Sequence, residues 1–342
     1  MRILILGGNG FIGYHLTSHI LRNTPWKVVG MDLGSSRLGE YLGHPRLKFV
    51  KGDITRHQPM VESLIRQSDV VMPLVAIAVP KVYVTDPLRV FRLDFEANLP
   101  IVKACVKYRK RLIFPSTSEV YGMCGDAKFD EEKSPLVLGP INKQRWIYSC
   151  SKQMLDRAIW AYGFQEGLDF TIFRPFNWIG PKLDSLSEAK EGCSRVVTQF
   201  IAEMCLGRPI RLVDGGRQKR TFTHISDGIS ALVKIVENKG KRCSGRIINV
   251  GNPANECSVR DLAFMLRKMF MAHPLHGTWK KQSKIIVVPS KKYYGEGYQD
   301  IMTRTPSIRL AKSLLHWKPK VALRDAMQMT LDAFLTENIQ RR

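Results

Sequence analysis

The chain has 342 residues, of which 44% are hydrophobic and 24% are charged, a composition typical of a globular protein with a substantial buried core. No apolar run reaches the ~18 residues that a membrane-spanning helix needs, so we expect no membrane segment. The 53 Lys and Arg residues exceed the 30 Asp and Glu residues, and the formal net charge is +23.

This positive charge raises the question of a nucleic-acid partner. Nucleic-acid-binding proteins gather their basic residues in a patch, stripe or tail. Here the basic residues are dispersed, and the sequence has no basic tail and no nucleic-acid-binding motif, so we expect no such partner. Two interpretations of the positive charge stay open. The protein has a generally basic surface, or some of its basic residues bind an anionic substrate.

The seven cysteines are scattered, and no pair has the spacing of metal ligands or of a CxxC motif. We therefore expect reduced thiols in the cytoplasm and no metal site. The apolar run at residues 3–6 is followed by glycines and is too short for the core of a secretory signal, which also favours the cytoplasm.

Strands and helices alternate through the first half of the chain. The pattern predicts strands at 2–6, 26–32, 46–53, 69–78, 110–118 and 169–180, and helices at 11–22, 58–67, 89–108 and 148–167. Repeated strand–helix units predict a parallel sheet with helices on both faces. After residue 180 the pattern loosens, with short strands near 209–213 and 245–250 and helices near 194–206, 227–238 and 258–270.

A glycine-rich segment, GGNGFIG at 7–13, joins the first strand to the first helix. Glycines permit a tight turn and a close approach of the backbone to a pyrophosphate, which then meets the N–H groups of the helix start. The residues predicted to contact the cofactor here are Gly7, Asn9, Gly10, Phe11, Ile12 and Gly13.

Two acidic residues follow at strand ends. Asp32 ends the second strand, where its carboxylate accepts hydrogen bonds from ribose hydroxyls and repels a 2′-phosphate, which favours NAD over NADP. Asp53 and Ile54 end the third strand, where they are predicted to lie beside adenine. The alternatives are a helix cap or turn for Asp32 and a simple turn for Asp53.

Tyr148 and Lys152 lie one helical turn apart on the same face of a predicted helix. An ammonium group beside a phenol lowers the pKa of the phenol, so that a phenolate takes a proton from a substrate alcohol. The lysine can also bind the nicotinamide ribose. Thr117 or Ser118, at the end of the strand at 110–118, would complete a hydroxyl–Tyr–Lys set.

With the glycine loop, this set resembles the extended short-chain dehydrogenase/reductase family, which acts mostly on nucleotide sugars. We therefore expect an α/β Rossmann fold, a doubly wound parallel sheet with a smaller, interleaved C-terminal substrate lobe. The NAD-binding domain is predicted at 1–180, joined by 225–255, and the substrate lobe at 181–224 and 256–342.

A closer resemblance covers nearly the whole chain. Its motifs are PLVAIA, FPSTSEVYGMC, RWIYSCSKQ, FRPFNWIGP, DGGRQKRTFT and YYGEGYQD. They resemble the dehydrogenase/decarboxylase half of the bifunctional polymyxin-resistance enzymes, which serve the 4-amino-4-deoxy-L-arabinose lipid A pathway and antibiotic resistance. The similarity is weaker around 272–290. Nothing here resembles the formyltransferase domain of those enzymes, so we expect a stand-alone homologue or an excised domain.

The resemblance implies NAD-dependent oxidative decarboxylation of UDP-glucuronate to a UDP-4-keto-pentose. Tyr148 would take the proton of the C4 hydroxyl as hydride leaves for NAD⁺, and the resulting β-keto acid would lose CO₂. Ser118, Glu119 and Arg304 would mark the decarboxylating members of the family. Glu119 would accept a proton or orient water near C5, or merely cap a loop. Arg304 would anchor the uronate carboxylate or donate a proton, although its high pKa favours the anchor.

The UDP group is expected to meet cations and amides. Asn177 lies just after RPF, at the end of the strand at 169–180, which is the sheet edge where ligands bind in such folds. Arg211 and Arg220 flank a basic turn that could clamp the diphosphate, although residues 217–220 could also form a solvated hairpin. The family resemblance adds the substrate positions Ala78, Tyr83, Arg145 and Tyr298.

Other functions stay open at this stage. A UDP-xylose synthase shares the early steps but reduces the keto intermediate again, and a UDP-glucuronate epimerase would release no CO₂. A non-catalytic NAD-binding or nucleic-acid-associated protein is less compatible with the set of site residues. Relatives pair through the helices expected at 89–108 and 148–167, so we expect a homodimer or higher homo-oligomer. Leu155, Trp160 and Ala161 are candidates for that contact or for the core.

Overall fold

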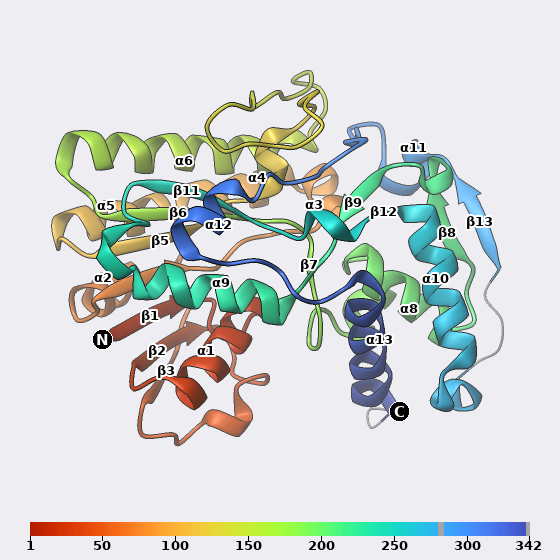
Figure 1. The fold of residues 1–342 in the computed structure, drawn as a ribbon, viewed down its shortest axis with the longest axis horizontal. Coiled ribbons are helices and arrows are strands. Elements are labelled where there is room, and N and C mark those ends of the chain that lie inside the picture. The colour runs from red at the N-terminus through yellow and green to blue at the C-terminus, as the bar shows by residue number, and fades with distance from the viewer. Residues whose placement is uncertain (280–283, 340–342) are drawn as a thin grey trace.

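The computed structural model describes residues 1–279 and 284–339. Its centre is a seven-stranded parallel sheet with the order β11-β6-β5-β4-β1-β2-β3 (Figure 1). These strands are β1 (Arg2–Leu6), β2 (Lys27–Asp32), β3 (Leu47–Lys51), β4 (Val70–Pro73), β5 (Arg111–Pro115), β6 (Phe170–Pro175) and β11 (Arg246–Val250). The strand order changes direction between β1 and β4, and the predicted doubly wound α/β fold is confirmed.

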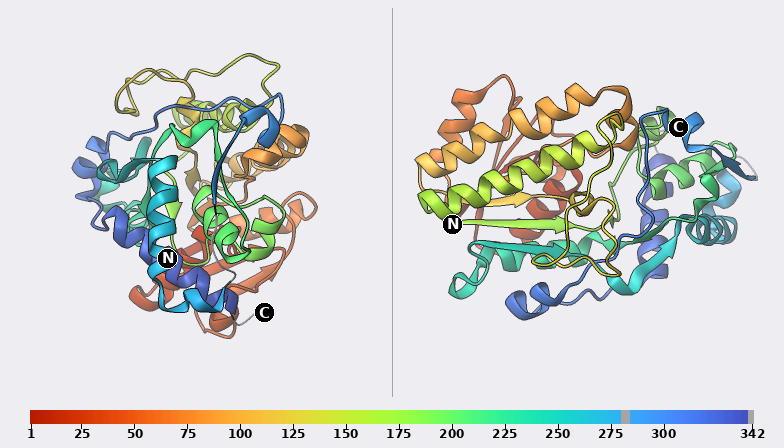
Figure 2. Two further views of the ribbon diagram at one scale, coloured as in Figure 1. Left: turned by 90° about the vertical axis from the view of Figure 1, so that its right-hand side faces the viewer. Right: turned by 90° about the horizontal axis from the view of Figure 1, so that it is seen from above.

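The side chains of β1 alternate between two apolar cores, as the two-residue period of a strand requires. Ile3 and Ile5 pack into the core on one face, and Leu4 and Leu6 into the core on the other. The first face is covered by α1 (Phe11–Asn23), α9 (Ile225–Glu237) and α12 (Arg309–Leu315), and the second by α2 (Gln58–Arg66), α5 (Leu99–Lys107) and α6 (Trp146–Glu166). Figure 2 shows α5 and α6 side by side over the sheet.

The single helix predicted at 89–108 is wrong. The chain forms α4 (Pro87–Phe91), a turn of π-helix, η2 (Arg92–Glu96), and then α5. Pro100 explains the interruption, because proline has no N–H for the carbonyl of Glu96 and its ring would collide with that carbonyl in a continuous α-helix.

Two predicted strands are shorter than expected. β4 ends at Pro73, after which the loop 74–79 leaves the sheet. β6 ends at Pro175, and Asn177 has a left-handed backbone with φ of 38° that redirects the chain. The next two residues form β7 (Trp178–Ile179), which pairs with β10 (Thr223–His224) in a separate small sheet.

A second apolar core lies beyond the carboxyl ends of the strands, on the right of Figure 1. Its main elements are α8 (Val196–Cys205), β8 (Ile210–Val213), α10 (Val259–Ala272), β13 (Ile285–Val288) and α13 (Leu323–Ile339). The shorter elements of this region are α7 (Leu186–Lys190), β9 (Lys219–Thr221), β12 (Glu256–Ser258) and α11 (Ser290–Tyr294), and α3 (Pro80–Thr85) belongs to the segment after β4.

Between these segments the chain returns to the main sheet, where α9 packs on α1 and β11 forms an edge strand. The boundaries predicted for the two lobes stay a prediction, and residues 280–283 and 340–342 of the expected lobe lie outside the described residues. Among the described helices, none is long and apolar enough to cross a membrane.

Candidate active site

A cleft of about 430 Å³ opens where the carboxyl ends of the central strands face the second core. It is lined by most of the residues predicted from the sequence, namely Gly7, Gly10, Phe11, Ile12, Gly13, Ala78, Tyr83, Thr117, Ser118, Glu119, Arg145, Tyr148, Lys152, Asn177, Arg211, Arg220, Tyr298 and Arg304. Asn9, Asp32, Asp53 and Ile54 lie outside this lining, and their contact with NAD stays a prediction.

The glycine loop closes tightly between β1 and α1. A Cβ at Gly13 would lie 2.3 Å from the carbonyl oxygen of Gly7, and Gly7 itself has φ of +89°. Only glycine at both positions allows this approach. The resulting turn presents the start of α1 to the cleft, and its backbone fits the pyrophosphate of a dinucleotide.

Asp32 ties β2 to this loop. Its Oδ2 accepts a hydrogen bond from the backbone N–H of Asn9 at 2.9 Å, and its Oδ1 accepts one from Leu33 at 2.7 Å. Burial raises the pKa of this carboxyl, while the two N–H donors oppose the rise. Each oxygen keeps a further lone pair, so the position remains suited to a ribose hydroxyl.

The carboxylate of Asp53, just after β3, forms hydrogen bonds with a residue close to it in the sequence. Asp53 Oδ1 accepts hydrogen bonds from the backbone N–H and the hydroxyl of Thr55, which lower the pKa of Asp53. Ile54 is buried in the core between the sheet and α2. The structure therefore shows a turn at this position.

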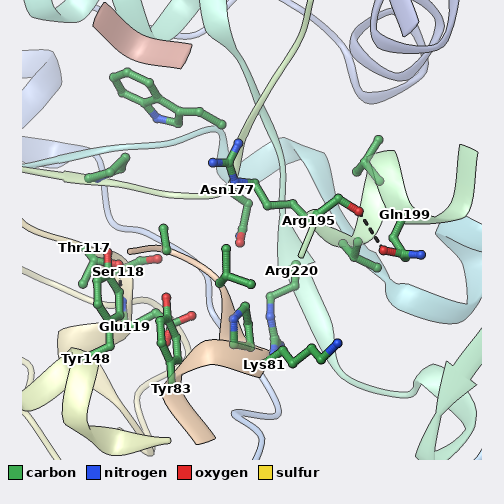
Figure 3. Close-up of a pocket in the computed structure, with 18 of the residues that line it drawn as sticks. Lys81, Tyr83, Thr117, Ser118, Glu119, Tyr148, Asn177, Arg195, Gln199 and Arg220 are labelled. Atoms are coloured by element: carbon green, nitrogen blue, oxygen red, sulfur yellow. Dashed lines mark hydrogen bonds between the residues drawn. The ribbon is translucent and has the colours of Figure 1, made fainter. Parts of the chain in front are cut away.

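Tyr148 and Lys152 are buried on the face of α6 that turns toward the sheet. Tyr148 stacks on Tyr83 of α3, with ring centroids 4.7 Å apart, and Figure 3 shows both rings beside Thr117 and Ser118. Lys152 Nζ donates to the carbonyl of Pro115 at 3.2 Å, at the end of β5. The set predicted from the sequence is thus assembled in one place.

The environment of Tyr148 differs from the expectation of a lowered phenol pKa. Burial raises the pKa of Tyr148 strongly, and the carboxylates of Asp94 and Glu119 raise it further. A hydrogen bond with Thr117 acts in the opposite direction. This environment favours the protonated phenol.

Glu119 lies between two guanidinium groups. Arg145 Nη1 is 2.9 Å from its Oε2, and Arg304 Nη1 is 3.0 Å from its Oε1. Burial opposes ionisation of this carboxyl, but the charges of Arg145 and Arg304 hold its pKa at about 2. Glu119 is therefore an ionised, doubly paired carboxylate that fixes both arginines.

Arg304 reaches the cleft from the irregular segment before α12. Besides Glu119, it donates to Ser118 Oγ and Asn177 Oδ1, each at 3.5 Å. The Nε atoms of Arg304 and Arg145 are buried and, among the described residues, have no hydrogen-bond partner. Buried guanidinium donors that lack an acceptor are costly, and an anionic ligand would satisfy them.

More cations lie toward the second core. Arg220 Nη2 is 2.6 Å from Asp300 Oδ1, and Arg211 Nη2 is 2.5 Å from Glu203 Oε1. The guanidinium of Arg145 lies 4.5 Å from the Trp146 ring centroid and 5.9 Å from that of Tyr298. Cations outnumber carboxylates along the cleft, as an anionic substrate requires.

Several cleft residues were missed in the sequence. Arg195, the N-cap residue of α8, and Gln199 within α8 lie across the cleft from Tyr148 in Figure 3, and Lys81 of α3 lies between the two sides. Asp94, which lies outside the cleft lining, was also missed. It is fully buried and lies 3.6 Å from Lys152.

A glycine-rich loop on a doubly wound sheet, joined to a Tyr–Lys pair, defines a dinucleotide-dependent enzyme of the short-chain dehydrogenase/reductase class. A family model described as "NAD dependent epimerase/dehydratase family" matches residues 3–251. The chain belongs to this family of NAD-dependent nucleotide-sugar epimerases and dehydratases, and NAD is its cofactor.

Solved structures agree along the full length. The crystal structure of the PbgP3 protein from Burkholderia pseudomallei is 50% identical with a TM-score of 0.91, covering 100% of this chain and 98% of that one. UDP-glucuronic acid 4-epimerase from Bacillus cereus, in complex with UDP-glucuronic acid and NAD, is 25% identical with a TM-score of 0.80, covering 99% and 100%. DesIV, a dTDP-glucose 4,6-dehydratase from Streptomyces venezuelae with NAD and TYD bound, is 22% identical, with a TM-score of 0.83 and coverage of 100% and 98%, and shows the shared fold.

Proposed function

We propose that the chain catalyses NAD-dependent oxidative decarboxylation of UDP-glucuronate to a UDP-4-keto-pentose, CO₂ and NADH. The observation that carries this proposal is the buried Arg304, which lies against Ser118 and Glu119 and has an unused Nε donor within the described structure. A substrate hydroxyl could accept from this donor, but it carries no charge to balance the guanidinium. A uronate carboxylate offers the planar acceptor that matches a guanidinium.

The comparisons support a uronate substrate. The epimerase from Bacillus cereus that shares the fold was solved with UDP-glucuronic acid and NAD. The sequence motifs resemble decarboxylating enzymes, and the residues that would mark decarboxylation, Ser118, Glu119 and Arg304, lie together in the structure. The keto-pentose would serve the cytoplasmic aminoarabinose pathway that this resemblance implies.

In the oxidation, Tyr148 takes the proton of the C4 hydroxyl, with Thr117 or Ser118 as a hydrogen-bond partner of the same oxygen. When bound, NAD⁺ would supply a positively charged nicotinamide ring, which would favour the phenolate and serve as the acceptor of the C4 hydride. Gly7, Gly10 and Gly13 would hold its pyrophosphate, and Asp32 its adenosine ribose. Stacking on Tyr83 fixes the plane of the Tyr148 ring.

In the decarboxylation, the bond between C5 and the carboxylate breaks, and its electron pair moves toward the C4 ketone. Hydroxyl donors at that oxygen stabilise the developing enolate. C5 then takes up one proton, which balances the proton that Tyr148 removed from the hydroxyl. Because the pKa of Glu119 is about 2, we assign it to orienting Arg304 rather than to accepting a proton.

The test is incubation of the chain with NAD⁺ and UDP-glucuronate, followed by NADH absorbance, CO₂ release and identification of the sugar. Equal amounts of NADH, CO₂ and keto-pentose support the proposal. CO₂ with UDP-xylose and no net NADH would identify the alternative, a UDP-xylose synthase. UDP-galacturonate without CO₂ would identify an epimerase, and either result refutes the proposed reaction.

We also propose that the chain forms a homodimer through α5 and α6. Trp160 of α6 is 51% exposed and Phe164 is 86% exposed, and such aromatic exposure is typical of interfaces. Leu155 of the same helix is fully buried and belongs to the core. Light scattering of the wild type and of Phe164→Asp tests this, and an unchanged mass for the variant would refute it.

A further inference from the structure

A carboxylate lies behind Lys152, inside the protein. Asp94 belongs to the π-helical turn η2, and its side chain is fully buried. Single turns of π-helix within α-helical segments are rare overall, but those that occur are often found at functional sites. Here the turn directs Asp94 toward α6, where its Oδ1 lies 3.6 Å from Lys152 Nζ.

The same turn is fastened to the loop that follows β4. Asp94 Oδ2 accepts a hydrogen bond from the backbone N–H of Ile77 at 3.0 Å. Asn98 donates to the carbonyl of Val75 at 3.4 Å. The start of this loop packs against the glycine loop, since a Cβ at Gly7 would lie 3.1 Å from the backbone of Leu74, and residues of the loop, including Ala78, line the cleft. Asp94 thus contacts Lys152 and the wall of the cofactor cleft at once.

The other charged groups near Lys152 are already engaged. Asp156, one turn along α6, is 3.0 Å from Arg174 of β6 and accepts a hydrogen bond from Ser116 at 2.7 Å. Glu119 is paired with its two arginines. The remaining titratable neighbours, Tyr148 and Tyr83, are neutral phenols because burial raises the pKa of each.

We propose that Asp94 is a positioning residue that keeps Lys152 protonated and seated between β5 and the loop 74–79 during oxidation of the substrate alcohol. A fully buried lysine loses its charge readily unless an anion lies beside it. Among the carboxylates described near Lys152, Asp94 is the one whose nearest cation is the lysine itself. The inference rests on the proposed function in one respect, because that function assigns the oxidation step to Tyr148 and Lys152.

The test is Asp94→Asn, which keeps the shape and removes the charge. Burial lowers the pKa of Lys152, and the carboxylate of Asp94 opposes this effect. Without the carboxylate, the lysine loses its proton at a lower pH, so the loss of kcat grows as the pH rises. We expect the alkaline limb of kcat for NADH formation to move down by about one pH unit or more. KM for UDP-glucuronate should change little.

A second readout does not depend on the sugar. Fluorescence titration with NADH at the same pH values should show affinity that weakens at alkaline pH in Asp94→Asn but not in the wild type. If the wild type fails to oxidise UDP-glucuronate, the proposed function fails, and the NADH titration still decides the role of Asp94.

Two further variants serve as controls. Asn98→Ala loosens the same turn without a change of charge, so it should lower kcat at every pH and leave the limbs in place. Asp94→Glu keeps the charge and should retain the wild-type alkaline limb. Asp94→Ser also removes the charge and takes the place of Asp94→Asn if that variant does not fold. Unchanged limbs in Asp94→Asn, an equal shift in Asn98→Ala, or a lowered limb in Asp94→Glu would overturn the proposal.

Discussion

Replacement of Glu119 by glutamine removes one negative charge from between two guanidinium groups and preserves the shape of the side chain. The charges of Arg145 and Arg304, at 2.9 and 3.0 Å, outweigh burial and hold the pKa of Glu119 at about 2, against its ordinary value of 4.5. One pKa unit corresponds to about 1.4 kcal/mol, so the ionised carboxylate contributes about 3 kcal/mol to the free energy of unfolding. Loss of one partner of a buried ion pair costs a similar amount, about 3–5 kcal/mol.

The pH dependence of this contribution has a definite sign. Because the folded state has the lower pKa, the contribution is complete above the unfolded pKa of 4.5 and is lost as the pH falls toward 2. We therefore expect Glu119→Gln to lower the free energy of unfolding by about 3 kcal/mol at both pH 7 and pH 6, with a smaller difference below pH 4.5.

Urea unfolding followed by circular dichroism measures this difference. Glu62→Gln is a matched control, because Glu62 forms an exposed pair with Lys107 at 2.7 Å and its loss should have no measurable effect. Equal stability of Glu119→Gln and the wild type at pH 7, or a difference that widens on acidification, would refute the reasoning.

Three further predictions concern the cleft. Arg304→Ala removes the anchor proposed for the uronate carboxylate, so kcat/KM for CO₂ release should fall about 100-fold or more; undiminished release would contradict the assignment. Tyr148→Phe keeps the stacked ring but removes the proton acceptor, so NADH formation should fall about 100- to 10,000-fold while NADH binding persists, and near-normal turnover would exclude Tyr148 as the base. Gly13→Ala places a Cβ 2.3 Å from Gly7 O, so fluorescence titration should show NADH affinity lower by about tenfold or more, and wild-type affinity would count against the cofactor loop.

The sequence predicted the central sheet well because its signals are local. The apolar run of β1 and the glycines that follow it report a buried strand and a tight turn within a dozen or so residues. The elements whose bounds were predicted wrongly are interrupted by single residues, and the periodicity of the apolar residues does not reveal such interruptions. Pro100 interrupts an apolar helical pattern, and the left-handed Asn177 separates two strands that read as one.

The site was less accessible to prediction, since its parts come together through tertiary structure. Arg304 lies in an irregular segment without periodicity, and its place beside Glu119 could be proposed only through the family resemblance. Asp94 lies in the segment predicted as one helix at 89–108, and nothing in the local pattern indicates the π-turn that directs it inward. Residues that lie far apart in the sequence and touch only in the folded protein have no fixed spacing, so neither composition nor periodicity can predict their contact.

The interleaved path of the chain has a consequence for its biosynthesis. Once Val250 has left the ribosome, all seven strands of the main sheet and the glycine loop are present. Arg304 and α13, which completes the second core, are synthesised later. A nascent chain is therefore expected to acquire its dinucleotide fold while Arg304 is still missing beside Glu119, and the pairing of Glu119 with both Arg145 and Arg304 is completed late in translation.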